Sequence, residues 1–71
     1  MSWKVTDVTD AGATTIQFVE RHNAHRHYEA VRSSPLTMFA VVQNGLGVSE
    51  VAYISEAALR LANVHDGKGS V

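Results

Sequence analysis

The chain of 71 residues contains no cysteine. This absence excludes disulfide bonds, thiolate metal ligands and thiol nucleophiles together. A domain of this length buries only about 60% of the surface that its unfolded chain exposes, so its own core supplies a few kcal/mol of stability at most. The remaining aids to stability are tight packing, a metal site built from histidine and carboxylate side chains, or association with another chain.

Charged residues are also scarce, at 18% of the chain against a typical share of about 25%. Apolar residues make up 45%, which indicates a globular protein and not a disordered one. Six Lys and Arg oppose seven Asp and Glu, so no whole-protein field attracts a nucleic acid or an anionic membrane. A surface poor in charge favours contact with a protein partner over free solvation.

Long apolar runs are missing as well. The longest run is Met38 to Val42, far below the roughly 20 residues that a membrane helix requires. The N-terminus lacks the apolar core of a signal peptide. We therefore expect a cytoplasmic protein with no membrane partner, made of one small domain over residues 1–66 and a flexible tail over 67–71.

Proline occurs once and glycine five times, and three of the glycines fall in two turn signals. TDAGA, residues 9–13, separates two stretches rich in Thr, Val, Ile and aromatic residues, which is typical of a hairpin. NGLG, residues 44–47, separates TMFAVVQ from VSEVAYI, and Asn-Gly between such flanks is the strongest short-range hairpin signal. The sequence therefore predicts hairpins over about 3–20 and 37–54.

The pattern changes after Ile54 to SEAALRLANV. Ser55 is a favoured N-cap residue, and Ala, Leu and Arg are strong helix formers, which predicts a C-terminal helix over about 55–64. Together these elements predict a small α+β domain, in which an antiparallel sheet of four or five strands has the C-terminal helix packed across it.

The stretch between the two hairpins allows a second interpretation. Residues 14–32 contain no Gly or Pro, which allows a helix over this stretch and the order β-α-β-β-α. On a helical wheel, however, Glu20 and His27 fall among the apolar positions while Phe18 falls on the polar side, so no apolar stripe forms. We prefer strands here, with residues 22–25 as a turn and with Tyr28 and Ala30 on one strand face.

This stretch includes RHNAHRHYE, residues 21–29, which gathers three of the four histidines. His22, His25 and His27 are the candidates for metal ligands. Zinc needs three or four converging ligands, and this spacing is typical of no metal motif. Arg21 and Arg26 would repel a dication. We expect no metal and no cofactor, and keep a histidine metal site as an alternative.

The same stretch carries a local excess of positive charge. Arg21, Arg26 and Arg32, with Tyr28 among them, form a patch that protonation of the histidines would strengthen below about pH 6.5. A small nucleic-acid-binding protein that uses these four residues is therefore a second alternative.

Catalytic constellations are not recognisable. A histidine base needs a nucleophile and an orienting acceptor within hydrogen-bond reach, and nothing in the spacing of Ser33, Ser34 and Asp66 indicates such a triad. NGLG lacks the Lys-Ser or Lys-Thr that follows a phosphate-binding loop. We therefore expect a protein that is not an enzyme.

The hairpin over residues 37–54 is apolar on both sides. Alternate side chains of a strand face opposite ways, so Phe39 and Val41 share a face with Val48, Ala52 and Ile54. The other face carries Met38, Ala40, Val42, Val51 and Tyr53. A ten-residue helix, roughly 15 Å long, covers only one of them. The second needs a second copy of the chain, another protein, or an internal helix from residues 14–32.

The leading hypothesis is a non-catalytic interaction module that self-associates, as a dimer, and binds another protein through an exposed sheet face or the His/Arg turn. Small regulators and inhibitors carried by phages and mobile elements are often of this size, so a regulator or inhibitor of that type is the finer expectation. The interaction residues expected on this basis are Met38, Val42, Val51, Tyr53, Arg21, Arg26, His27 and Tyr28. Substituting Val42 or Val51 by Glu separates the cases: an interface dissociates with the fold retained, whereas an internal core unfolds.

Overall fold

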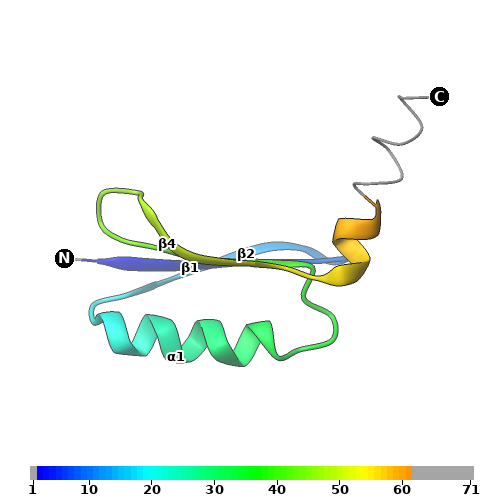
Figure 1. Cartoon of the computed structure of the whole chain (residues 1–71). Helices are drawn as coiled ribbons and strands as arrows, with labels where there is room; N and C mark the ends of the chain where they lie inside the picture. The colour runs from blue at the N-terminus through cyan, green and yellow to red at the C-terminus, as the bar shows by residue number, and fades with distance from the viewer. Residues whose placement is uncertain (1, 62–71) are drawn as a thin grey trace.

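The computed structural model describes residues 2–61 (Figure 1). The elements follow in the order β1 (Trp3–Thr9), β2 (Gly12–Phe18), α1 (Arg21–Arg32), β3 (Phe39–Gln43) and β4 (Ser49–Ile54). A further helix, here called the C-terminal helix, begins at Glu56 and reaches Leu61, the last described residue. The predicted α+β domain with a four-stranded antiparallel sheet is confirmed.

Both predicted hairpins are present. The strands lie in the order β2-β1-β3-β4, and every neighbouring pair is antiparallel. Gly12 starts β2 with a φ of 125°, a conformation that glycine adopts without steric cost. In the second turn the side-chain oxygen of Asn44 accepts hydrogen bonds from the backbone N–H groups of Leu46 and Val48, at 2.8 and 3.1 Å. The backbone of Asn44 closes the same loop, because its N–H donates to the C=O of Val48 at 2.9 Å and its C=O accepts from the N–H of Gly47 at 3.0 Å.

Residues 14–32 follow neither interpretation over their whole length. Residues 14–18 belong to β2, whereas residues 21–32 form α1, so the expected turn at 22–25 and the expected strand through Tyr28 and Ala30 are wrong. Ala24, Tyr28 and Val31 are spaced four and three residues apart and therefore line one side of a helix. A helical wheel that starts at residue 14 mixes strand residues into this pattern and hides it.

The core lies between α1 and one face of the sheet. Val5 of β1 and Ala40 and Val42 of β3 are completely buried against Ala24 and Tyr28 of α1. Five partly buried residues surround them: Trp3, Phe18, Val31, Val51 and Tyr53. An internal helix therefore covers the face that carries Val42, Val51 and Tyr53.

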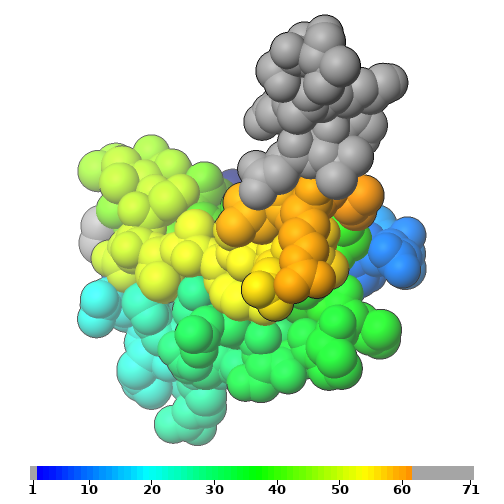
Figure 2. Space-filling model, turned by 45° about the vertical axis from the view of Figure 1, so that its right-hand side comes forward, coloured from blue at the N-terminus to red at the C-terminus, as the bar shows by residue number. Residues whose placement is uncertain are grey.

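Within residues 2–61, no helix lies across the opposite side of the sheet. Figure 1 shows α1 on one side only, while the C-terminal helix stands beyond the end of the sheet and does not lie across it. In the space-filling view, β4 (yellow) and the first turn of that helix (orange) lie above α1 (green) (Figure 2). The expected helix end at residue 64, the domain end at residue 66 and the tail at 67–71 fall outside the described residues. Over residues 2–61 no helix is long and apolar enough to span a membrane.

The burial of Val42 makes a stability prediction. Val42→Glu places an unpaired carboxylate in a fully buried position, which costs about 3 kcal/mol or more and exceeds what so small a core supplies. We expect the variant to be unfolded at 25 °C by circular dichroism. Ala52→Glu, on the exposed side of the neighbouring strand, is the control and should keep the native spectrum. A folded Val42→Glu variant would show that α1 does not seal this face.

Candidate interaction surfaces

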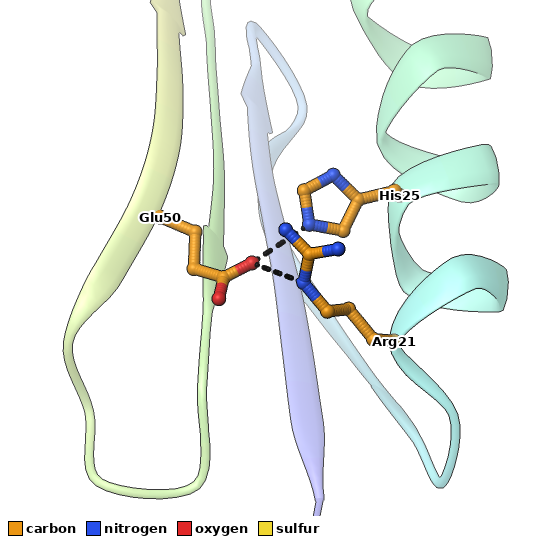
Figure 3. Close-up of polar contacts among 3 residues, drawn as sticks. All are labelled: Arg21, His25 and Glu50. Atoms are coloured by element: carbon orange, nitrogen blue, oxygen red, sulfur yellow. Dashed lines mark hydrogen bonds and ion pairs between the residues drawn. The ribbon is translucent and has the colours of Figure 1, made fainter.

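Three polar side chains join α1 to β4 at one end of the helix (Figure 3). Glu50 Oε1 accepts a hydrogen bond from Arg21 Nε at 3.0 Å and lies 2.8 Å from His25 Nε2. Because a carboxylate only accepts hydrogen bonds, the contact with His25 requires the proton on Nε2. The side chains of Glu50 and His25 are 24% and 31% exposed, and that of Arg21 is 62% exposed, so the cluster lies at the surface.

A β-bulge directs Glu50 toward the helix. Val42 pairs with Val51 and Gln43 pairs with Ser49, so Glu50 is an extra residue in β4. In a regular strand Glu50 would face away from its neighbour Val51, which packs against the core under α1. The extra residue changes the direction of the side chain, which is a known effect of bulges. The carboxylate consequently meets α1, whose first turn contains no acidic residue.

The two partners of Glu50 also determine its ionisation. Hydrogen bonds from His25 and Arg21 favour the carboxylate over the acid and lower the pKa of Glu50 below its ordinary value. Arg21 has a second neighbour, since its guanidinium lies 5.9 Å from the centroid of the Trp3 ring. The cluster therefore connects β1, α1 and β4.

The three candidate metal ligands point to three different neighbours. His25 binds Glu50, His22 Nδ1 lies 3.4 Å from Glu20 Oε1, and the His27 ring packs against Phe18 with a centroid distance of 5.3 Å. Among residues 2–61 there is no group of three His, Cys, Asp or Glu side chains able to hold a metal ion. The described part of the chain thus does not bring these histidines together.

The residues considered for nucleic-acid binding are likewise dispersed. Arg21 is bound by Glu50, and Arg32 lies 5.6 Å above the Tyr53 ring and 3.4 Å from Glu29. Tyr28 is only 3% exposed, and burial raises the pKa of its hydroxyl group. Arg26 is exposed on α1. The four residues therefore form no continuous basic surface with an accessible aromatic ring.

The expected interaction residues of the second hairpin lie on the covered side. Val42 is completely buried, and Val51 and Tyr53 pack against the core beneath α1. Met38 belongs to the segment that connects α1 to β3. Its side chain is half-buried and lines a hollow beside the C-terminal helix. The face that α1 leaves uncovered is therefore the other one, which carries Phe39, Val41, Ala52 and Ile54.

This other side, called the open face below, is apolar toward the end where the C-terminal helix begins. Phe39 and Ile54 are 36% and 47% exposed, while Val41 beside them is 8% exposed. Strand alternation and register place twelve residues on it: Lys4, Thr6, Val8, Ala13, Thr15, Gln17, Phe39, Val41, Gln43, Ser49, Ala52 and Ile54. Lys4 is the single charged side chain in this set, so the open face is nearly neutral.

The hollow beside Met38 offers no evident chemistry. It lies between residues 35–38 and the C-terminal helix, and its lining is mainly aliphatic with one carboxylate, Asp10. The Ser55 hydroxyl oxygen accepts a hydrogen bond from the backbone N–H of Ala58 at 3.1 Å, as an N-cap does. In the described residues, neither group lies in a nucleophile–base pair.

No protein-family model, curated protein or solved structure matches this chain. Its function is therefore inferred from the geometry of its own residues.

The lowered pKa of Glu50 predicts how Glu50→Gln changes stability with pH. A carboxyl group whose pKa is lower in the folded than in the unfolded state stabilises the fold above its unfolded pKa, near 4.5, and loses this effect as the pH falls through the folded value. Wild type should therefore melt at a higher temperature than Glu50→Gln at pH 7, and the gap should close in acid.

The matched control for this measurement is Glu56→Gln. Glu56 pairs with Arg60 on the same exposed helix at 3.4 Å, and such surface pairs contribute little. The melting temperature of Glu56→Gln should equal that of wild type at every pH. A gap between wild type and Glu50→Gln that stays constant from pH 7 to pH 2 would contradict the proposed charge effect.

Proposed function

We propose that this chain is a non-catalytic protein-interaction module that self-associates through the open face of its sheet. The observation that carries the proposal is that α1 covers one side of the sheet and leaves Phe39, Ala52 and Ile54 exposed on the other. An antiparallel sheet that faces water normally carries polar side chains there. Apolar side chains in those positions gain free energy when a partner removes them from water.

The charge of the open face favours a second copy as the partner. With Lys4 as its single charged strand position, the face meets its own copy with little like-charge repulsion, whereas an acidic or basic partner finds few charges to match. Two copies related by a two-fold axis place the same residues on both sides of the contact. Their sheets would pack about 10 Å apart, with strands inclined by about 30°.

Regulation or inhibition of another protein is the finer proposal for the same surface. A target with a matching apolar surface would compete with the second copy for the open face. The nucleic-acid alternative gains no support, because Tyr28 is buried and Arg21 already binds Glu50. A catalytic role gains none from the described residues, since the exposed polar cluster uses the same Glu50 oxygen for both of its partners.

Ile54→Lys tests the open face. The substitution adds a charge at the apolar end of the face, so two faces would bring like charges together and lose apolar contact. We expect the mass of the assembly in sedimentation equilibrium at micromolar concentration to fall by half, with the fold unchanged.

Leu46→Lys is the control for this experiment. Leu46 is 82% exposed in the loop between β3 and β4, at the end of the sheet opposite to Phe39 and Ile54, and the introduced residue is the same. Its mass should equal that of wild type. An unmodified chain that sediments as a monomer, or an Ile54→Lys variant with the wild-type mass, would reject self-association through this face.

A further inference from the structure

We propose that the free edge of β2 pairs with β2 of a second copy, so that two four-stranded sheets join into one continuous antiparallel sheet. This contact uses the edge of the sheet and not its open face. This edge pairing is argued from separate observations, and its test does not depend on the proposed function.

β2 itself contains no charge, no proline and no bulge, which are features that keep edge strands apart. From Ala11 to Val19 the chain contains no charged residue and no proline. β2 pairs with β1 over its full length without a bulge, and six of its seven residues are exposed. Thr14, Thr15 and Ile16 are β-branched and favour extended backbone. A long, uncharged and regular edge of this kind is a template for another strand.

The opposite edge, at β4, is protected by contrast. Its ladder with β3 is interrupted by the bulge at Glu50, and bulges and charges both discourage pairing. Arg21 and His25 of α1 extend to Glu50, and Arg32 lies over Tyr53. On the β2 side, the His27 ring of α1 packs on the Phe18 ring with a centroid distance of 5.3 Å. Within residues 2–61, the β4 edge is thus guarded by a bulge and by charged side chains, whereas the β2 edge has neither a bulge nor a charged residue of its own.

The hairpin geometry determines which main-chain groups of β2 are available. Thr9 and Gly12 flank a two-residue turn and form a hydrogen-bonded pair. Such pairs alternate along an antiparallel ladder, so Gly12, Thr14, Ile16 and Phe18 bond to β1. The N–H and C=O groups of the residues between them, Ala13, Thr15 and Gln17, point away from the sheet.

These three residues are symmetric about Thr15, which suits a second copy of the same strand. An antiparallel partner centred there places Thr15 opposite Thr15 and Ala13 opposite Gln17. Each opposed pair exchanges two hydrogen bonds, so all the free groups of the three residues gain partners. Thr–Thr pairs across strands are favourable, and no charged side chains of β2 oppose each other. Ile16, now 39% exposed, becomes covered beside Thr14 of the partner strand.

Pairing through β2 stops at two copies. A two-fold axis perpendicular to the joined sheet puts both α1 helices on one side and both open faces on the other. The remaining edges are the two guarded β4 strands, so no third copy adds to the sheet. With the proposed contact of open faces, two such joined sheets form a closed assembly of four copies.

Thr15→Pro tests the edge directly. Proline removes the outward N–H of Thr15 and leaves the bonds to β1 intact, and proline is tolerated on edge strands. We expect the mass in sedimentation equilibrium to fall to half the wild-type value. Thr15→Val is the matched control, because it changes the same side chain but keeps the N–H, and its mass should equal that of wild type. A folded Thr15→Pro variant with the wild-type mass overturns the inference.

Hydrogen exchange of the unmodified chain tests the edge pairing without any substitution, so misfolding of a variant does not affect the result. Paired edges slow the exchange of the amide protons of Ala13, Thr15 and Gln17. The amide of Ala52 is the internal control, because ladder alternation through β3 points it outward on the guarded edge of β4. If Ala13, Thr15 and Gln17 exchange as fast as Ala52 at micromolar concentration, the inference fails.

The two contacts are separated by combining variants. If both exist, Thr15→Pro and Ile54→Lys each halve the mass of a four-copy assembly, and the double variant is a monomer. Halving by Ile54→Lys alone overturns the edge pairing and leaves the proposed function standing. Halving by Thr15→Pro alone supports the edge pairing and rejects self-association through the open face.

Discussion

The packing of α1 against one face of the sheet is the constraint on which the rest of the structure depends. The small side chain of Ala24 and the ring of Tyr28 close over Val5 and Val42, and these residues form the most deeply buried part of the described chain. A single helix of 12 residues covers one side of a four-stranded sheet and no more. The open face follows from this single helical layer.

The polar cluster at Glu50 makes the arrangement asymmetric. The bulge in β4 adds one residue and thereby turns a carboxylate from the open side to the helix side. Arg21 and His25 then bind it, which links the start of α1 to β4 and places charges beside that edge. The same contacts keep Glu50 off the open face, where it would add a charge to a nearly neutral surface. The bulge in β4 thus interrupts the β4 edge, removes a charge from the open face and provides the carboxylate that binds the start of α1.

Local signals in the sequence predicted the hairpins because turn chemistry is local. Asn44 closes its own loop, and Gly12 adopts a conformation that few other residues accept. The histidine-rich stretch was misjudged because its helical periodicity begins only at Arg21, after a strand with a different period. The role of Glu50 had no signal in the sequence, since a bulge depends on the register between two strands and not on the residues of one.

By itself, the sequence determined the positions of the turns, the start of the C-terminal helix at Ser55 and the exclusion of thiol chemistry. It also determined which residues of the second hairpin share a face, because alternation follows from strand geometry alone. Only the tertiary structure decided which of those two apolar faces meets a helix. Both faces offer similar apolar surface, and the choice arises from α1, whose packing on Val42 leaves Phe39 and Ile54 on the exposed side.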